Sequence, residues 1–237
     1  MKILKKIANT FGYNLTRKHK SETLKEIFYE RIKKNDCDFL IDVGANVGNF
    51  FHEYHRFFKK TFVFEPNKNL FNTLKNKFEK FKDIEFYSDG VGHKGEQKTF
   101  YITGDRDGSL SSIKNQSKIM SSILRHTNII EEYNINIIKL SNFIKNNNFH
   151  KNSFFLKIDT QGNDLEVLLG LEEFINNVRF IKVELPVINL YETSYNYNDI
   201  NEFMKINKFK PVYLEHISRT KDAELVEYDA LFEKITD

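Results

Sequence analysis

A glycine turn between two apolar runs is the feature that most constrains the fold of this chain. Residues 39–50 have the sequence FLIDVGANVGNF, and residues 61–67 have the sequence TFVFEPN. The first run breaks at a Gly-Ala-Asn-Val-Gly turn, a helical pattern follows, and the second run ends on the carboxylate of Glu65. This order predicts a strand, a tight turn, a helix and a second strand, which form half of a nucleotide-binding site. The turn lets the backbone approach a ligand, and the acid can accept hydrogen bonds from ribose hydroxyls.

The details of the turn favour one kind of nucleotide over another. A dinucleotide-binding turn has the spacing G-x-G-x-x-G, whereas here Asn46 stands between Gly44 and Gly48 where a middle glycine would be. Asparagine tolerates left-handed backbone angles, so the turn can still be tight. Asp42, just before the turn, would repel a pyrophosphate and suits a ligand with an ammonium or sulfonium group. We therefore expect S-adenosylmethionine as the cofactor rather than NAD.

The rest of the chain alternates between strand-like and helix-like patterns. The expected strands are 39–44, 61–66, 84–90, 97–103, 135–140, 154–159, 179–185, 210–216 and 229–235, and the expected helices are 48–59, 67–80, 117–132, 163–176 and 197–207. Strands that alternate with helices predict an α/β fold with a doubly wound, mostly parallel sheet. The last two strands have no helix between them, so we expect an antiparallel edge hairpin.

The N-terminal residues 1–36 form a basic, helix-prone extension, and residues 37–237 form the main domain. Apolar residues of the segment 1–20 fall near one helical face, which predicts either a helix on a membrane surface or a helix that packs on the domain. A second helix is expected over residues 22–34. No apolar run approaches the ~18 residues that span a bilayer, and the single cysteine, Cys37, excludes an intramolecular disulfide. The expected location is the cytoplasm, either free or at the inner face of the membrane.

Four segments together resemble one known family. The sequences IDVGANVGNF, VFEPN, LKIDTQGNDLEVLLG (156–170) and IKVEL (181–185) are similar to those of the FkbM family of S-adenosylmethionine-dependent methyltransferases, over roughly residues 38–235. Many class I methyltransferases share the first motif, whereas the third is much more specific. The resemblance implies a seven-stranded Rossmann-like sheet with the cofactor at the carboxyl ends of the first strands. It also implies methyl transfer, usually to a hydroxyl of a sugar or small metabolite.

The candidate cofactor-binding residues follow the first strands. They are Asp42, Gly44, Asn46, Gly48, Glu65 and Asp89. The chain departs from the family pattern at two places near this site. After the third strand it has Asp89-Gly90-Val91-Gly92 where the family tends to show an alanine-containing turn, and Leu140 is followed by Ser141-Asn142 where the family often has an acidic pair.

Two acids near the ends of neighbouring strands are the catalytic candidates. Methyl transfer to an alcohol requires the hydroxyl to lose a proton, and a nearby carboxylate can take that proton or hold the hydroxyl. Asp159 and Glu184 are each expected near the end of a neighbouring strand, where they could play this role. The alternatives are that Asp159 caps the following helix and that Glu184 pairs with a lysine, and Lys157 is expected to be a strand residue with a salt-bridge partner. Candidate substrate contacts are Ser109, Ser111 and Tyr191; the alternatives are a loop with a helix cap for the serines and a loop packed on the domain edge for the tyrosine.

The sequence is compatible with more than one function. We expect no metal site, because His52 and His55 are three apart rather than four; a magnesium ion at Asp159 is the alternative. The net charge of +3 is too mild to predict nucleic-acid binding. The favoured function is O-methylation of a sugar hydroxyl in a cell-surface glycan or its precursor. Alternatives are a nucleic-acid or small-metabolite methyltransferase, a non-catalytic binding module and an NAD-linked oxidoreductase. The oligomeric state stays open.

Overall fold

The chain divides into two compact units, residues 1–34 and 35–237. The computed structural model describes residues 24–32, 37–105, 108–192 and 195–236. In the first unit, the described residues form α2 (Leu24–Ile27), a short α-helix, and η1 (Phe28–Ile32), a π-helical turn. The amphipathic helix expected within residues 1–20 lies outside the described residues.

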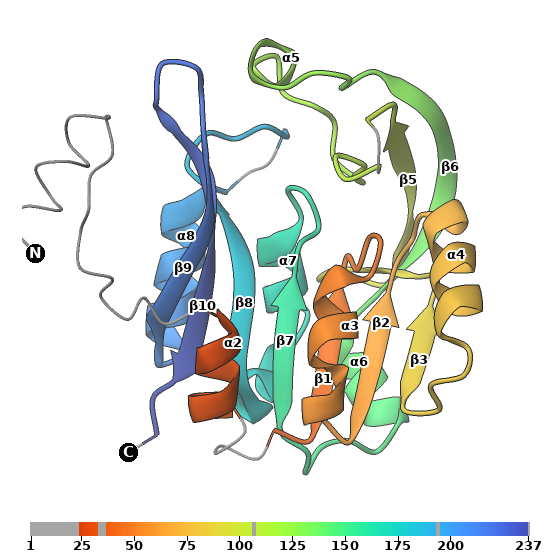
Figure 1. The fold of residues 1–237 in the computed structure, drawn as a ribbon, viewed down its shortest axis with the longest axis vertical. Coiled ribbons are helices and arrows are strands. Elements are labelled where there is room, and N and C mark those ends of the chain that lie inside the picture. The colour runs from red at the N-terminus through yellow and green to blue at the C-terminus, as the bar shows by residue number, and fades with distance from the viewer. Residues whose placement is uncertain (1–23, 33–36, 106–107, 193–194, 237) are drawn as a thin grey trace, which may run out of the picture. The chain divides into compact units, whose positions relative to one another are not determined.

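A seven-stranded sheet forms the centre of the larger unit (Figure 1). Its strands are β1 (Phe39–Val43), β2 (Lys60–Phe64), β3 (Ile84–Tyr87), β7 (Phe154–Ile158), β8 (Val178–Pro186), β9 (Phe209–Arg219) and β10 (Leu225–Lys234), in the order β3-β2-β1-β7-β8-β10-β9. The first five strands in this order run parallel, and β10 is antiparallel to both β8 and β9. The predicted α/β fold with an antiparallel edge hairpin is confirmed, and the second strand of the hairpin is the one that joins the sheet.

Helices cover both faces of this sheet (Figure 1). The helical segments are α3 (Asn49–Tyr54), η3 (His55–Phe57), α4 (Lys68–Phe78), α6 (Leu140–Asn146), α7 (Asp164–Leu169), η4 (Glu172–Asn177) and α8 (Tyr197–Ile206). The central strands β1 and β7 are buried at every residue, as expected for parallel strands that are packed on both faces. Phe51 of α3 packs on Phe78 of α4 on one face, whereas Phe143 of α6 packs on Phe62 and Phe64 on the other.

A small second sheet was not anticipated. It contains β4 (Gly90–Val91), β5 (Glu96–Thr103) and β6 (Ile129–Ile138) in the order β4-β6-β5. The strand expected at 97–103 is confirmed as β5, but the helix expected over 117–132 is wrong. Only α5 (Met120–Ile123) is helical there, and residues 129–132 belong to β6. The reason is the period-two pattern of β6, in which Ile135 and Ile137 are buried against β5 while Asn134 and Asn136 are exposed.

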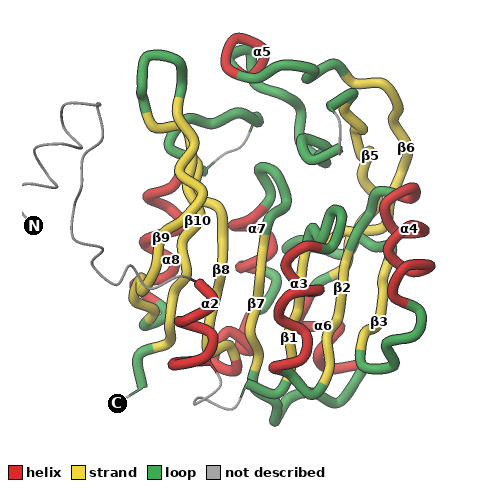
Figure 2. The backbone as a smooth tube through the Cα atoms, viewed as in Figure 1, coloured by secondary structure: helices red, strands yellow, loops and turns green. Residues whose placement is uncertain are grey.

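The carboxyl ends of the parallel strands β1, β2 and β7 lie at the same edge of the large sheet. Figure 2 shows this edge at the top of the view, with the loop that contains α5 above it. In an open α/β sheet this edge is where ligands bind. Among the described residues, no helix is both long and apolar enough to cross a membrane.

Candidate active site

The turn that follows β1 adopts the tight backbone that its sequence predicts. Gly44, Asn46 and Gly48 have φ angles of 75°, 50° and 85°, so Asn46 is left-handed as expected. A Cβ atom on Gly44 would lie only 1.9 Å from the carbonyl oxygen of Asp159. Glycine is therefore required at this position both by the backbone angle and by the close approach of the chain after β7.

Glu65, at the end of β2, is tied to the same turn. Its Oε2 accepts a hydrogen bond from the backbone N–H of Asn46 at 2.7 Å, and its Oε1 accepts one from Asn67 at 2.8 Å. The side chain is only 5% exposed, and this burial raises the pKa of Glu65 to about 7, although both backbone N–H groups oppose the shift. Each carboxylate oxygen has a further lone pair. Glu65 can therefore accept from a ribose hydroxyl, and the residues present fit the expected cofactor.

Asp42 lies beneath the turn and has a partner within the protein. Its side chain is fully buried, and its Oδ1 is 3.1 Å from the Nζ of Lys157 on β7. Burial raises the pKa of Asp42, while the lysine opposes that shift. The repulsion of a pyrophosphate that we attributed to Asp42 is thus offset by Lys157. Contact between Asp42 and the cofactor stays a prediction.

Lys157 links the turn after β1 to the acid after β7. Its buried Nζ donates to the carbonyl oxygen of Gly44 and lies 3.6 Å from Oδ2 of Asp159, in addition to its ion pair with Asp42. Burial lowers the pKa of Lys157, but the two carboxylates outweigh burial and raise it. Lys157 therefore carries its charge in the core, and the prediction that it has a salt-bridge partner is confirmed.

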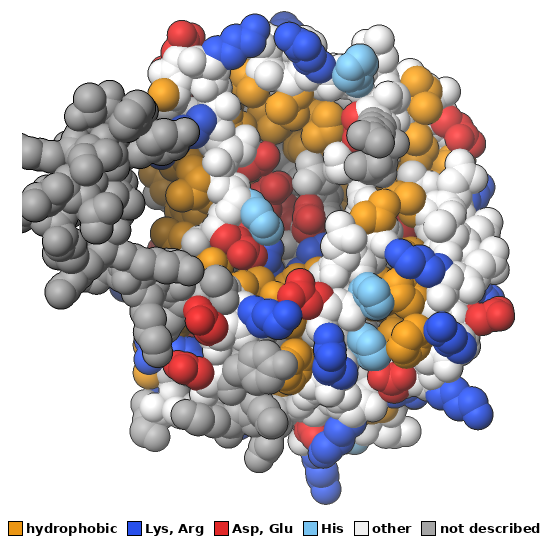
Figure 3. Space-filling model, in the orientation of Figure 1, with side chains coloured by type: hydrophobic (Ala, Val, Ile, Leu, Met, Phe, Trp, Pro, Cys, Tyr) orange, Lys and Arg blue, Asp and Glu red, His pale blue; other side chains and the backbone are white. Residues whose placement is uncertain are grey.

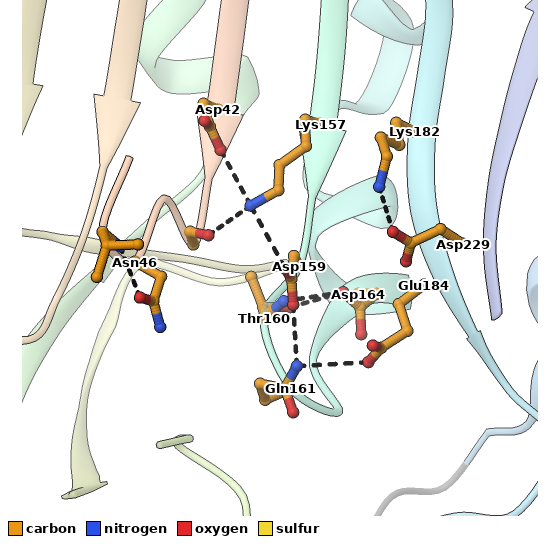
Figure 4. Close-up of polar contacts among 12 residues, drawn as sticks. Asp42, Asn46, Lys157, Asp159, Thr160, Gln161, Asp164, Lys182, Glu184 and Asp229 are labelled. Atoms are coloured by element: carbon orange, nitrogen blue, oxygen red, sulfur yellow. Dashed lines mark hydrogen bonds and ion pairs between the residues drawn. The ribbon is translucent and has the colours of Figure 1, made fainter. Parts of the chain in front are cut away.

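The two catalytic candidates meet at one glutamine. Nε2 of Gln161 donates to Oδ1 of Asp159 at 2.9 Å and lies 3.5 Å from Oε2 of Glu184 (Figure 4). The side chain of Asp159 is 42% exposed. Burial raises its pKa, but the Lys157 ammonium and the Gln161 amide outweigh burial and lower it. Burial and the charge of Asp159 raise the pKa of Glu184 well above its usual range. The surroundings thus shift the pKa values of the two acids in opposite directions, down for Asp159 and up for Glu184.

The alternative roles of these two acids find no support in the described residues. The N-cap residue of α7 is Asn163, and the carboxylate that accepts from the N–H of Thr160 at 3.0 Å is Asp164. Asp159 therefore does not cap that helix. In the part of the chain that the structure describes, no lysine lies within ion-pair distance of Glu184.

Further acids surround the pair, and sequence analysis did not identify them as site residues. Burial raises the pKa of Asp164 to about 6, and burial together with the charge of Asp159 raises the pKa of Glu227 on β10 to about 7. Figure 3 shows a hollow on this face, above the carboxyl ends of β7 and β8, in which Asp and Glu side chains gather. The available signal for Glu227 was the sequence Glu-Tyr-Asp (227–229), which places two acids on one face of a strand.

The predicted substrate residues lie in two segments beside this hollow. The N–H and Oγ of Ser109 both donate to Asp105, and Oγ of Ser111 accepts from the N–H of Thr103 at 3.2 Å. These hydroxyls have partners at the end of β5 and in the loop that follows it, and their contact with substrate stays a prediction. Ser112, in the same serine-rich segment, donates its Oγ hydrogen to the carbonyl oxygen of Gln161 at 2.6 Å.

Tyr191 and Asp89 occupy different positions at this edge of the sheet. Tyr191 is buried, and its hydroxyl lies 2.8 Å from Oε1 of Gln161 and 2.9 Å from the carbonyl oxygen of Leu110. It packs against Gly162, where a Cβ would lie 2.7 Å from the Cβ of Tyr191. Tyr191 is thus part of the wall that supports Gln161. Asp89 is partly exposed in the link between β3 and β4, and its cofactor role stays a prediction.

A further group of side chains has the spacing of metal ligands. Within the described part of the chain, ligand atoms of Glu215, His216 and Asp229 lie within 4.8 Å of one another. The two acids already have a cationic partner within the protein. Nζ of Lys182 donates to Asp229 and lies 3.5 Å from Oε1 of Glu215. His55, which we considered as a ligand from the sequence, instead lies 3.0 Å from Asp83.

Comparisons with known proteins bear on this arrangement. A family model described as the methyltransferase FkbM domain matches residues 42–211, from β1 into β9. A search of the curated proteins found no match. The solved structures that are similar include a methyltransferase FkbM from Methylobacillus flagellatus KT, with 15% identity and a TM-score of 0.49. That match covers 82% of this chain but 44% of the other, so the chain spans less than half the length of that protein.

Two further solved structures cover most of both chains. An rRNA methylase from Streptococcus thermophilus has 9% identity and a TM-score of 0.47, with 92% of this chain and 100% of that chain covered. A candidate methyltransferase from Streptococcus mutans, in complex with SAH, has 11% identity and a TM-score of 0.42, with 84% and 89% covered. The family model spans well over half of the sequence, from the buried Asp42 through the glycine turn and the acid pair to the edge hairpin. The chain therefore belongs to the FkbM family of S-adenosylmethionine-dependent methyltransferases.

Proposed function

We propose that this protein transfers a methyl group from S-adenosylmethionine to a hydroxyl, and that the acceptor is a sugar hydroxyl of a cell-surface glycan or its precursor. The observation that carries the proposal is the placement of Asp159. This carboxylate is 42% exposed, is held ionised by Lys157 at 3.6 Å, and follows the strand next to the glycine turn. An ionised acid beside the donor site is what a hydroxyl acceptor requires.

The donor half of the site comprises the turn 44–48 and Glu65. The turn offers its backbone to the cofactor, and Glu65 would accept hydrogen bonds from the ribose hydroxyls. S-adenosylmethionine, when bound, supplies an electrophilic methyl group on its sulfonium sulfur. The two backbone N–H groups that fix Glu65 keep its carboxylate from turning away from the turn.

The acceptor half comprises Asp159, Gln161 and Glu184. An alcohol oxygen that forms a new bond to carbon must lose its proton, and Asp159 is the group that accepts it or holds the hydroxyl in line. Lys157 keeps Asp159 ionised and so able to accept. Burial and the neighbouring acids raise the pKa of Glu184, and in its protonated form Glu184 can donate a hydrogen bond to a second oxygen of the acceptor. A sugar offers such neighbouring oxygens.

The charge of the acceptor half distinguishes the proposed acceptor from a nucleic acid. The acids around the hollow are Asp159, Asp164, Glu184 and Glu227, and the charge of Asp159 raises the pKa of each of the other three. Their two nearest cations, Lys157 and Lys182, are already paired with Asp42 and Asp229. The negative charges of a nucleic-acid backbone would be repelled by the ionised acids of this group. The electrostatics therefore favour a neutral polyhydroxyl acceptor. A cytoplasmic enzyme would meet such an acceptor as a glycan precursor.

Binding and transfer can be measured separately on the full chain. Calorimetry with S-adenosylhomocysteine and with NAD tests the donor half, and binding of NAD alone would overturn the proposal. A radiolabelled methyl-transfer assay on cell-envelope glycan extracts tests the acceptor. Asp159→Asn should lower transfer by about 100-fold or more while leaving S-adenosylhomocysteine binding intact. The matched control is Asp222→Asn, an exposed acid in the turn between β9 and β10. Binding without transfer to any extract would instead indicate a non-catalytic module.

A further inference from the structure

Gln161 has an unusual backbone conformation at the centre of the acceptor half. It is the second residue after Asp159, in the turn between β7 and α7, and its φ angle is 53°. A residue with a side chain rarely adopts such an angle unless its surroundings fix it.

Each polar group of the Gln161 side chain has a partner. Its Nε2 lies 2.9 Å from Oδ1 of Asp159 and 3.5 Å from Oε2 of Glu184, and its Oε1 lies 2.8 Å from the hydroxyl of Tyr191. Its backbone carbonyl accepts from Oγ of Ser112 at 2.6 Å. Because an ionised carboxylate can only accept, the nitrogen of the amide must face Asp159. The oxygen then faces Tyr191, whose single hydroxyl proton is shared between this oxygen and the carbonyl oxygen of Leu110 at 2.9 Å.

We propose that Gln161 is a positioning residue that fixes Asp159 and Glu184 relative to each other and keeps Asp159 ready to accept a proton. The two N–H groups of a primary amide suffice for one hydrogen bond to each acid. A donor to the ionised form favours that form, which offsets the neighbouring carboxylates that disfavour it. The inference rests on the proposed function, because it assigns a role to Gln161 within the same acceptor half.

Several charged groups act on Asp159 besides Gln161, and the test must separate their effects. The cations that face it are Lys157 and Lys182, and the acids that interact with it are Asp42, Asp164, Glu184 and Glu227. All of these remain in place when only residue 161 is changed. A change in the titration of Asp159 in a folded variant of Gln161 therefore reports the loss of the amide.

The experiment is a pH titration of the carboxyl carbons by ¹³C NMR on the full chain, with Asp159→Asn and Glu184→Gln to assign the signals. Gln161→Met has a similar length and no N–H, and we expect the titration midpoint of Asp159 to move to higher pH. Gln161→Glu, which adds a carboxylate, should move it further. The matched control Gln97→Met removes an exposed amide that contacts Asn136 on the small sheet, and it should leave the midpoint unchanged.

The outcomes separate this inference from the proposed function, since the titration needs neither an acceptor nor methyl transfer. An unmoved midpoint in folded Gln161→Met and Gln161→Glu overturns the role of Gln161, whatever the cofactor measurements show. If both variants fail to fold, Tyr191→Phe removes the hydroxyl that orients Oε1, and an unmoved midpoint there overturns it as well. If the wild type did not bind S-adenosylhomocysteine, the proposed function would be wrong. The titration would still show whether Gln161 acts on Asp159.

Discussion

The donor and acceptor halves of the site are built in different ways. The donor half comes from one continuous stretch, in which backbone N–H groups of Asn46 and Asn67 hold Glu65. The acceptor half brings side chains from separate segments into contact, with Gln161 between Asp159 and Glu184. A backbone-built site tolerates few changes of main-chain geometry, whereas a side-chain network responds mainly to changes of charge. Substitutions in the donor half should therefore act mainly through main-chain geometry, and substitutions in the acceptor half mainly through charge.

The largest expected effect is that of Gly44→Ala in the donor half. A Cβ there would lie 1.9 Å from the carbonyl oxygen of Asp159, at a residue whose φ angle is 75°. Strain and overlap should cost roughly 4 kcal/mol of stability or more. Urea unfolding measures the stability, and calorimetry should show loss of S-adenosylhomocysteine binding in whatever protein remains folded.

A second glycine provides the control for that substitution. Gly95 has no positive φ angle, and a Cβ on it would meet only the carbonyl oxygen of Ile137 at 3.8 Å. Gly95→Ala should change stability by about 0.5 kcal/mol or less. If Gly44→Ala behaved like Gly95→Ala, the donor half would not depend on its backbone, and the contrast between the halves would break.

The next effect tests the residue that joins the two halves. Lys157→Met leaves the buried Asp42 without its cation and should lower the free energy of unfolding by about 3 kcal/mol. The double variant Asp42→Asn/Lys157→Met removes both charges and should recover at least half of that loss in the same urea experiment. Equal losses in the single and double variants would show that packing of the Lys157 chain, rather than its charge, connects the halves.

A smaller effect concerns the pH dependence of cofactor binding. Glu65 has a pKa of about 7 in the folded protein, and only its ionised form accepts from two ribose hydroxyls. Affinity for S-adenosylhomocysteine should therefore rise about tenfold between pH 6 and pH 8. In Glu65→Gln the rise should disappear. Calorimetry at both values of pH checks this, and a rise that persists in the variant would assign the titration to another group.

Much of the fold could be predicted because the core strands repeat one simple pattern. Buried parallel strands such as β1 and β7 appear in the sequence as short apolar runs, and the spacing of helices between them fixes the sheet class. The predicted helix over 117–132 failed because the pairing of β6 with β5 joins residues that are 26 to 41 positions apart along the chain. Such non-local pairing overrides local helical preference.

The same distinction explains which site residues the sequence identified. Glu65 and the turn at 44–48 belong to one contiguous motif, so their proximity follows from the chain itself. Glu227 reaches the acceptor half only because β10 pairs with β8 in a register that places Asp229 opposite Glu184. Gln161 lies within the motif at 156–170, but its role depends on Tyr191 and Ser112, which come from segments distant in the sequence.

The smallest expected effect has the opposite sign and lies in the acceptor half. The pKa of Glu227 is raised to about 7 in the folded protein, so its ionisation opposes folding. Stability is therefore lost as the pH rises from the usual range of a glutamate toward 7, and Glu227→Gln should recover about 1 kcal/mol at pH 8 and almost nothing at pH 5. Urea unfolding at both values of pH measures this, with the exposed Glu224→Gln as control. A loss of stability at pH 8 would show that Glu227 is a structural partner. A gain would show that the ionisation of Glu227 lowers the stability of the acceptor half, as the raised pKa of Glu65 implies for the donor half.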